Sequence, residues 1–430
     1  MITCYLHDGE VCNEGKSVKD LGNLCFSLKS NLNLLNSIPI EAMILMLSEY
    51  GRRLSLNKGL LKIEGVPFLS FFLKKGNIEK LIETSLKDKK FLNEFIEIGN
   101  GKLIKAQGRG ITCHWVAGNI PTLAVYSIFQ ALIAQNSNIV RVPKQSIELV
   151  LELLKLMEDI EISYESNVYS SKNMLKNITL IYFDSNDKLM NESMSILADA
   201  RVIWGGEEAV KAINLLPKKT TCKDIVFGPK YSFAVFDKNI IESDECESYM
   251  DKLVMDISMF GQKACSSPQL LFIERSNVPL KKVAEKLASS FEKLGRRYLN
   301  ILDESTASEI INRRGIYALS IDKDLYCSKG LSYTILVNNE IVLEEPIGGR
   351  CLFLKEIDSI FEVKDLITKR TQTIGIASKD RDKILKFADI VTSLGVDRIV
   401  NLGLMNIYDF PWDGCFIISE LIRWCSVNIA

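Results

Sequence analysis

Apolar residues along the chain follow two spacings, and these predict different secondary structures. Short apolar runs at residues 177–184, 201–204 and 269–274 predict buried strands. Between such runs, apolar residues recur on one helical face, as they do over residues 125–133 and 279–294. Strands and helices that alternate in this way are typical of a parallel, doubly wound sheet. The pattern therefore predicts an α/β fold.

Turns that follow the strands of the first half carry candidate binding chemistry. Helical patterns at residues 39–53 and 77–98 come first and carry little readable chemistry. The run GITCHWVAGNIPT then predicts a strand and a sharp turn, and Gly205-Gly206 separates the strand RVIW from the helix EEAVKAINLL. Such turns direct backbone N–H groups and the positive end of a helix to the carboxyl edge of the sheet. The phosphates of a dinucleotide can bind at that edge.

A polar connection in the second half places one cysteine outside the apolar stripes. Asp244 and Glu247 have capping-box spacing and predict the start of a helix that runs to Ile257. The connection FGQKACSSPQ follows, then the strand QLLFIE and a helix that Gly295 stops. Loops on a rigid sheet often carry chemistry, and a loop thiol can act as a nucleophile. Cys265 is therefore a candidate nucleophile, with a passive loop thiol as the alternative.

Composition narrows the classes of function. The 430 residues are 47% hydrophobic, enough for two or three domains, and the net charge of −1 leaves no basic surplus for nucleic acid or an anionic membrane. Eleven cysteines without metal-ligand spacing indicate free thiols, a cytoplasmic setting and no metal site. Residues 115–140 carry no charge, but Pro121, two glutamines and three asparagines interrupt them. We expect a buried strand, turn and helix there, and no membrane span.

Four sequence blocks carry a resemblance to a known family. In chain order they are GNIPTLAVYSIFQALIAQNSNIVRVP, ADARVIWGGEEAV, FGPKYSFAV followed by GQKACSSPQ, and DRIVNLGLMNIYDFPWDG. They resemble the aldehyde dehydrogenase superfamily and, within it, the acyl-CoA reductases of bacterial bioluminescence operons, the LuxC family. Lys263 and Ala264 both stand between Gly-Gln and Cys265, a spacing that is similar to the reductase branch. Residues 1–110 match weakly.

The resemblance implies an aldehyde dehydrogenase-like fold, with a Rossmann-like nucleotide-binding domain and an α/β catalytic domain. A helical segment over residues 1–110 would pack on the nucleotide-binding domain, which would span residues 111–240. The catalytic domain would span residues 241–395, and a C-terminal segment, 396–430, would return to the active site and the nucleotide-binding domain. The resemblance also implies a homo-oligomer and an acyl-transferring synthetase as partner.

The resemblance assigns catalytic roles to particular residues. Cys265 would attack an acyl thioester and form a covalent acyl-enzyme, because a thiolate is both an effective nucleophile and a good leaving group. Asn119 matches the family's oxyanion asparagine, with the backbone N–H of Cys265 as the second donor. The alternative for Asn119 is a turn residue that supports Pro121. His114 lies near this turn, but a histidine in a strand is expected to be structural.

The same resemblance implies a site for the nicotinamide half of a cofactor. Trp204, Gly205 and Gly206 match the turn under the pyrophosphate and nicotinamide, where missing side chains let the backbone approach. A simple helix start is the alternative. Glu345 resembles the glutamate that holds the nicotinamide ribose, although Ile347 replaces the usual aromatic residue.

Residues near the adenosine ribose bear on the choice of cofactor. Val142 replaces the family's usual lysine, and Gln145 stands where NAD-preferring members often carry a glutamate. Arg141 and Lys144 are the nearby cations. Because no carboxylate would repel a 2′-phosphate, NADPH is expected rather than NADH. The alternative is that both bases point to solvent.

Together, these matches to the family imply an NADPH-dependent acyl-CoA reductase that converts a fatty acyl-CoA to an aldehyde, with coenzyme A as leaving group. Val226 stands where hydrolytic aldehyde dehydrogenases carry the glutamate that activates water, which favours reduction over hydrolysis. Asp224 is the candidate for a substitute base, so a hydrolytic aldehyde dehydrogenase stays open. An acyl-carrying or acyltransferase subunit without reductase activity also stays open, since the usual ribose lysine is missing.

Overall fold

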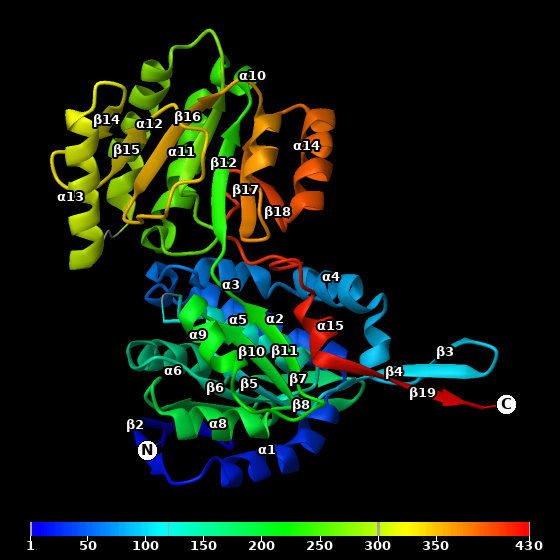
Figure 1. The fold of residues 1–430 in the computed structure, drawn as a ribbon. Helices are drawn as coiled ribbons and strands as arrows, with labels where there is room; N and C mark the ends of the chain where they lie inside the picture. The colour runs from blue at the N-terminus through cyan, green and yellow to red at the C-terminus, as the bar shows by residue number, and fades with distance from the viewer. Residues whose placement is uncertain (1, 119, 299–301, 430) are drawn as a thin grey trace. The chain divides into compact units, whose positions relative to one another are not determined.

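The computed structural model describes residues 2–118, 120–298 and 302–429, which form two compact units (Figure 1). Unit 1 comprises Met1–Gly228 and Tyr408–Ala430, and unit 2 comprises Pro229–Ile407. Each unit contains its own seven-stranded sheet.

Strand pairing sets the limits of unit 2. The sequence assigned residues 229–240 to the nucleotide-binding domain and residues 396–407 to the C-terminal segment. In the structure, β12 (Tyr231–Phe236) and β18 (Arg398–Asn401) both pair in parallel with β17 (Thr371–Ala377). Both stretches therefore lie in unit 2.

The sheet of unit 1 is mostly parallel, with strand order β11-β10-β5-β6-β9-β1-β2. The first five strands pair in parallel, and β1 and β2 add antiparallel at one edge. Sequence patterns before residue 110 indicated only helices, but Ile2, Cys4 and Leu6 are buried at alternate positions and hold β1 in the sheet. The seven strands are β1 (Ile2–His7), β2 (Glu10–Val18), β5 (Ile111–Trp115), β6 (Ser137–Arg141), β9 (Ile178–Tyr182), β10 (Ala200–Trp204) and β11 (Lys223–Phe227).

Helices cover both faces of this sheet (Figure 1). One face packs against α2 (Ile40–Leu56), α3 (Val66–Phe72), α4 (Lys75–Leu86), α5 (Thr122–Ile133), α6 (Ile147–Lys155), α7 (Lys172–Leu175) and α15 (Ile417–Leu421). The other face packs against α1 (Leu21–Asn36), α8 (Lys188–Leu197) and α9 (Glu207–Asn214). Every residue of α5 is buried, which explains the uncharged stretch around it. Among the described residues, no helix is both long and apolar enough to cross a membrane.

Two smaller sheets complete unit 1. β19 (Ile422–Asn428), β4 (Lys102–Gly108) and β3 (Ile96–Gly99) form an antiparallel ribbon that extends from the main body of the unit (Figure 1). β7 (Glu161–Tyr164) pairs with β8 (Asn167–Ser170). The predicted helix 77–98 was wrong beyond Leu86, because Lys87 adopts a left-handed φ of 71° and β3 then pairs with β4.

The sheet of unit 2 has the order β14-β15-β16-β13-β12-β17-β18. Only β14 is antiparallel to its neighbour. The strands not yet given are β13 (Leu270–Glu274), β14 (Asp324–Cys327), β15 (Thr334–Val337) and β16 (Cys351–Ile357). One face packs on α10 (Lys238–Ile241), α11 (Cys246–Ser258) and α12 (Leu280–Leu294), and the other on α13 (Glu304–Leu319) and α14 (Arg381–Leu394).

The predicted capping box at the start of α11 was wrong. The N-cap is Glu245, and no side chain caps the helix there. Glu245 instead forms an ion pair with Lys379. The helix thus begins at Cys246, one residue later than the spacing of Asp244 and Glu247 indicated.

Three charged side chains meet where the strands of unit 2 end. Asp237 follows β12, and Glu274 is the last residue of β13. Lys383, in the first turns of α14, lies 3.2 Å from a carboxylate oxygen of Asp237 and 2.8 Å from one of Glu274. The two carboxylates are nearly inaccessible to solvent, so one ammonium group balances both in the interior.

Lys383→Met should destabilise unit 2 by roughly 3–5 kcal/mol, because it leaves two carboxylates buried without their cation. Urea unfolding followed by circular dichroism measures the effect. Lys386→Met is the matched control, since Lys386 is an exposed residue of the same helix. Equal unfolding midpoints for the two variants would contradict the prediction.

Candidate active site

The connection between α11 and β13 has an unusual backbone. Phe260, Gly261 and Gln262 are consecutive left-handed residues with φ of 54°, 59° and 63°. For residues with a Cβ this conformation costs about 1–2 kcal/mol each, so surrounding contacts must hold it. Gln262 donates through Nε2 to the backbone oxygens of Pro268 and Cys351 at 2.9 and 3.0 Å. The loop is therefore pinned to itself and to β16.

A second glutamine closes the same loop from its other end. Gln269 donates through Nε2 to the backbone oxygens of Gln262 and Ser267, both at 3.2 Å. Its own backbone joins the sheet, since its N–H donates to the oxygen of Ser232 at 3.0 Å. Both glutamines are buried. They turn a polar, strained connection into a fixed one.

Cys265 lies within this closed loop and is half-buried. Its backbone oxygen accepts a hydrogen bond of 2.7 Å from the hydroxyl of Ser232 in β12. Its sulfur accepts one of 3.2 Å from Nε2 of Gln372 in β17. The sheet thus fixes both the main chain and the thiol of the predicted nucleophile.

The residue after Cys265 is anchored by a longer chain of contacts. Ser266 donates through Oγ to Oδ1 of Asn406 at 2.7 Å, and Nδ2 of Asn406 donates to the backbone oxygen of Asp256 in α11 at 2.7 Å. The Asp256 carboxylate accepts the backbone N–H groups of Gly403 and Met405 at 2.6 and 3.2 Å. Burial raises the pKa of Asp256 to about 7, and the two N–H donors oppose that shift.

Most other thiols of the chain lie in surroundings that suppress reactivity. Burial raises the pKa of Cys4 to about 11 and that of Cys351 to about 12, and it raises the pKa of Cys113 as well. Like Cys265, Cys425 has a sulfur that accepts a hydrogen bond, which comes from Arg423 at 2.9 Å. Cys425 lies on β19, however, a strand that is mostly exposed. A buried amide donor on the sulfur of a loop cysteine distinguishes Cys265 from these.

Unit 1 holds the predicted cofactor turn through a buried network. The ring of Trp204 stacks on Phe227 with centroids 3.8 Å apart, and its Nε1 donates to Oγ of Ser127 at 3.2 Å. His114 lies 2.8 Å from the same Ser127 oxygen and 2.9 Å from Oδ1 of Asn138. Burial lowers the pKa of His114 to about 4, which suits the structural role expected of it.

The turn itself has room above its backbone. Gly206 caps α9, and a Cβ added to it would meet no atom within 4 Å. The backbone N–H of Gly205 donates to the oxygen of Phe227 at 3.1 Å, which fixes the turn to β11. Glu207 and Glu208 occupy the first turn of α9, so an anion would approach over the glycines rather than along the helix axis.

The two bases near the expected adenosine ribose differ in their surroundings. Arg141 donates through Nε and one terminal nitrogen to the backbone oxygen of Phe183, and its guanidinium lies over the Phe183 ring at 5.7 Å. Lys144 and Gln145 are exposed. A Cβ on Gly118 would come within 2.7 Å of Nε2 of Gln145, so this side chain lies against the turn that precedes Asn119. Lys144 is therefore better placed than Arg141 to meet a phosphate.

Glu345 is exposed in unit 2, in a loop that a buried lysine supports. Lys355 in β16 is fully buried and donates to the backbone oxygens of Glu340 and Val342 at 2.6 and 3.0 Å. Its ammonium also lies 2.8 Å from Oε1 of Glu344, the neighbour of Glu345. Burial raises the pKa of Tyr231 in β12, and the charges of Glu344 and Glu345 add a smaller increase.

Val226 and Asp224 are the two positions considered for a water-activating base, and both lie in β11. Val226 is 40% exposed in β11, while its neighbours Ile225 and Phe227 are buried, so it does not face the core. Asp224 forms two hydrogen bonds of 2.7 Å with the buried Arg201 and one of 2.6 Å with Lys218. These cations hold the pKa of Asp224 below its usual value, which makes it a poor general base.

The predicted site residues divide between the units. Cys265 and Glu345 belong to unit 2, whereas Arg141, Lys144 and the Trp204-Gly205-Gly206 turn belong to unit 1. Asn119 lies outside the described residues. Within the described parts of the chain, no group of three or more histidine, cysteine, aspartate or glutamate residues is arranged to hold a metal ion.

Sequence reasoning missed the polar residues that hold Cys265, which are Ser232, Gln372 and Asn406. The signal was present for one of them, since Ser232 interrupts the otherwise apolar strand run YSFAVF, whereas Gln372 lies between two threonines in TQTIGIA. A buried polar residue in a strand needs a partner, but the sequence does not say which one.

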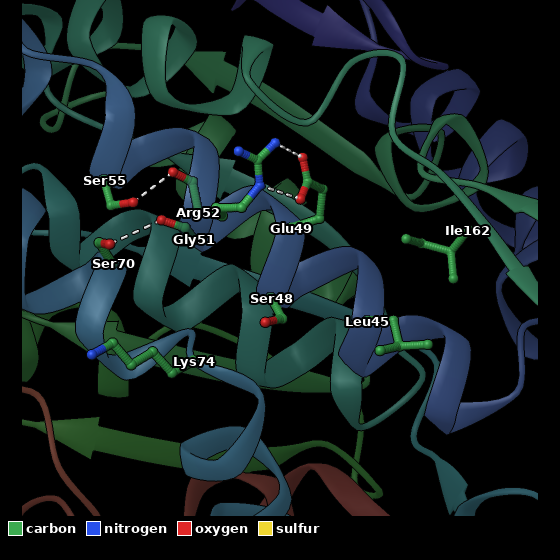
Figure 2. Close-up of a pocket in the computed structure, with 9 residues that line it drawn as sticks. All are labelled: Leu45, Ser48, Glu49, Gly51, Arg52, Ser55, Ser70, Lys74 and Ile162. Carbon is green, nitrogen blue, oxygen red and sulfur yellow. Dashed lines mark hydrogen bonds and ion pairs between the residues drawn. The ribbon is translucent and has the colours of Figure 1, made fainter.

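A separate hollow of about 460 Å³ lies on the helical layer of unit 1 (Figure 2). Leu45, Glu49 and Arg52 of α2 line it together with Lys74, and Glu49 and Arg52 are bound to each other at 2.7 Å. None of the predicted site residues lines this hollow. The hollow therefore does not belong to the predicted catalytic or cofactor-binding site.

Comparison with known proteins places the chain in a family. The sequence model of the acyl-CoA reductase (LuxC) family matches residues 47–424. The chain belongs to the LuxC acyl-CoA reductase family. The match extends into the N-terminal segment, for which the four sequence blocks gave little.

Named relatives of this LuxC-family chain are long-chain acyl-protein thioester reductases. The Vibrio harveyi protein is 26% identical over 452 residues, covering 97% of this chain and 89% of the relative. The Aliivibrio fischeri protein is 26% identical over 331 residues, covering 75% of this chain and 65% of the relative.

Solved structures of similar fold are aldehyde dehydrogenases. Aldehyde dehydrogenase C from Pseudomonas syringae, solved with NAD+ and octanal, has a TM-score of 0.70 at 11% identity and covers 100% of this chain and 93% of its own. A 3,6-anhydro-L-galactose dehydrogenase has a TM-score of 0.67 at 13% identity, with coverages of 100% and 96%. The predicted aldehyde dehydrogenase-like fold is confirmed.

The buried His114 should make unit 1 of this LuxC-family chain sensitive to acid. In the unfolded chain the histidine takes up a proton below pH 6.5, whereas in the folded state it does so only near pH 4. The stability contribution is therefore complete above pH 6.5 and is lost as the pH falls to about 4, by up to about 3 kcal/mol.

Urea unfolding followed by tryptophan fluorescence at a series of pH values measures this loss, because all four tryptophans belong to unit 1. His114→Gln should flatten the acid dependence. His7→Gln is the control, since His7 is the chain's other histidine and should leave most of the slope in place. An unchanged slope in His114→Gln would refute the assignment.

Proposed function

We propose that this protein is a nicotinamide-dependent reductase that converts a long-chain acyl thioester to an aldehyde through a thioacyl group on Cys265. The observation that carries the proposal is the fixed loop, in which Ser232 holds the main chain of Cys265 and Gln372 donates to its sulfur. Membership of the LuxC family supports it. The named relatives are reductases of acyl-protein thioesters, so we propose an acylated protein thiol as donor, beside acyl-CoA.

The chemistry begins and ends on the Cys265 thiolate. It attacks the acyl carbon, a new C–S bond forms, and the donor thiolate leaves and takes a proton. We assign Asn119 to the oxyanion from the sequence alone. A nicotinamide cofactor, when bound, supplies the hydride that reduces the thioacyl carbon. The C–S bond to Cys265 then breaks, the thiolate recovers its electron pair, and the aldehyde is released. Overall, one thioester, one hydride and one proton give an aldehyde and a free thiol.

The residues of unit 1 fit a nicotinamide cofactor. Open space over Gly206 supports a close approach of the pyrophosphate to the backbone. Lys144 would meet the 2′-phosphate of NADPH, and the exposed Gln145 carries no charge to repel it. Glu345 belongs to unit 2, and its proposed role at the nicotinamide ribose rests on the sequence resemblance alone. NADPH is thus the proposed cofactor, and these residues its proposed ligands.

Reduction is favoured over hydrolysis by the lack of a suitable base at two positions. Val226 cannot accept a proton, and Asp224 is bound to Arg201 and Lys218. An acyl-enzyme without a water-activating base persists until hydride or a thiol reaches it. This chemistry requires an acyl donor, and the proposed partner is a protein that delivers the acyl group. A homo-oligomer is proposed from the family resemblance alone.

Incubation with labelled acyl-CoA, or with an S-acylated protein, should place one acyl group on Cys265 in the absence of cofactor. Adding NADPH should then release aldehyde. Cys265→Ala should abolish labelling and turnover, and Cys327→Ala, which removes an exposed thiol of the same unit, should change neither. Mass spectrometry locates the label, and chromatography separates aldehyde from acid.

Other outcomes of this experiment identify other functions. Rapid release of acid without a thiol would indicate a hydrolytic aldehyde dehydrogenase. Labelling of Cys265 without any reduction by NADPH or NADH would indicate an acyl-carrying subunit. Label on a different cysteine would reject Cys265 as the nucleophile.

Lys144→Ala should raise the KM for NADPH about tenfold while changing that for NADH much less, since a charged hydrogen bond to the 2′-phosphate is lost. Initial rates with both cofactors measure the ratio. Lys188→Ala is the control, because Lys188 is an exposed lysine of the same unit on α8. Equal losses with the two cofactors, or a wild-type preference for NADH, would reject the assignment.

A further inference from the structure

Strand β17, which carries the hydrogen-bond donor to the sulfur of Cys265, pairs irregularly with β12. Tyr231 of β12 pairs with Thr371 of β17, but Phe233 pairs with Ile374. Two residues of β17, Gln372 and Thr373, therefore stand opposite one residue of β12. This two-against-one arrangement is a bulge, which bends a strand and redirects its side chains.

The bulge changes which way Gln372 can face. Ile374 and Ile376, beyond the bulge, pack in the apolar core on one side of the sheet. At the bulge, Nε2 of Gln372 lies 3.2 Å from the sulfur of Cys265. Gln372 is fully buried, so this amide has been withdrawn from water and directed at one atom.

Ser232 holds the bulge in place. Its hydroxyl oxygen accepts the backbone N–H of Thr373 at 3.2 Å, a group that the bulge removes from the regular ladder. The same hydroxyl donates its proton to the backbone oxygen of Cys265 at 2.7 Å. One serine therefore fixes the cysteine and the strand that carries Gln372 relative to each other.

We propose that Gln372 is a further catalytic residue, which stabilises the Cys265 thiolate by donating a side-chain N–H to its sulfur. An N–H donor favours the charged form of an acceptor, and an amide cannot take the proton from the thiol. The same bond stabilises the sulfur both before it attacks the thioester and as it leaves the aldehyde. Ser232 is a positioning residue for both partners. The inference rests on the proposed function where it names Cys265 as the nucleophile.

The test is the pH dependence of alkylation of Cys265, which requires neither acyl donor nor cofactor. The protein is pulsed with iodoacetamide at a series of pH values, and the Cys265 peptide is quantified by mass spectrometry. Gln372→Met fills the same space without a donor. It should slow alkylation near neutral pH by about tenfold to a hundredfold and move the profile to higher pH. With an acyl thioester as substrate, kcat should fall more than KM rises.

Two further variants sharpen the result. Gln372→Glu keeps the shape, and once its carboxyl group is ionised it offers only acceptors, so at pH values where it is ionised it should slow alkylation at least as much as Gln372→Met. Thr373→Val removes a neighbouring buried hydroxyl and keeps the backbone N–H, so the alkylation profile should stay as in the wild type. Continued protection of the buried Cys351 from alkylation shows that each variant is folded.

Wild-type alkylation profiles in folded Gln372→Met and Gln372→Glu would overturn the proposal. Shifted profiles in both, in a protein that makes no aldehyde from any thioester, would support the inference and reject the proposed function instead.

Discussion

The hydroxyl of Ser232 is the constraint on which the geometry around Cys265 depends. It donates to the backbone oxygen of Cys265 and accepts the N–H of Thr373, so it links a loop and a strand far apart in sequence. The backbone oxygen of the same serine accepts the N–H of Gln269 at the other end of the loop. Ser232 is fully buried, and losing its hydroxyl would leave polar groups without partners in the interior.

The remaining contacts keep this arrangement rigid. Left-handed residues at Phe260 and Gln262 store strain that would relax in an isolated loop. Gln262 and Gln269 oppose that relaxation with four hydrogen bonds to backbone oxygens. Asn406 adds a link from Ser266 to the end of α11. Because several independent contacts hold Cys265, the proposed nucleophile, it keeps its orientation before substrate binds.

The proposed cofactor turn in unit 1 is organised by the same principle with different residues. Trp204 is fixed by stacking on Phe227 and by one hydrogen bond to Ser127, which in turn is bound to His114. The glycines that follow carry no side chain, and Gly206 leaves open space. In both units, buried polar side chains hold a short segment of backbone that must keep a particular shape.

The sequence by itself determined the layered α/β fold, because apolar periodicity reports which residues must be buried. It also singled out Cys265 and the Trp204-Gly205-Gly206 turn, because their types and neighbours are local properties of the chain. Local signals failed where distant partners compete: the helix predicted to run to residue 98 yields to the pairing of β3 with β4. The capping box predicted before α11 does not form, because the helix takes Glu245 rather than Asp244 as its N-cap.

Only the tertiary structure decided what contacts the thiol. Gln372 lies 107 positions from Cys265 along the chain, and a bulge whose register depends on both strands directs it there. Neither the bulge nor the role of Ser232 has a local signature, since each depends on strands that meet only after folding. Residue types therefore indicate the chemistry of this protein, whereas its geometry follows from long-range pairing and burial.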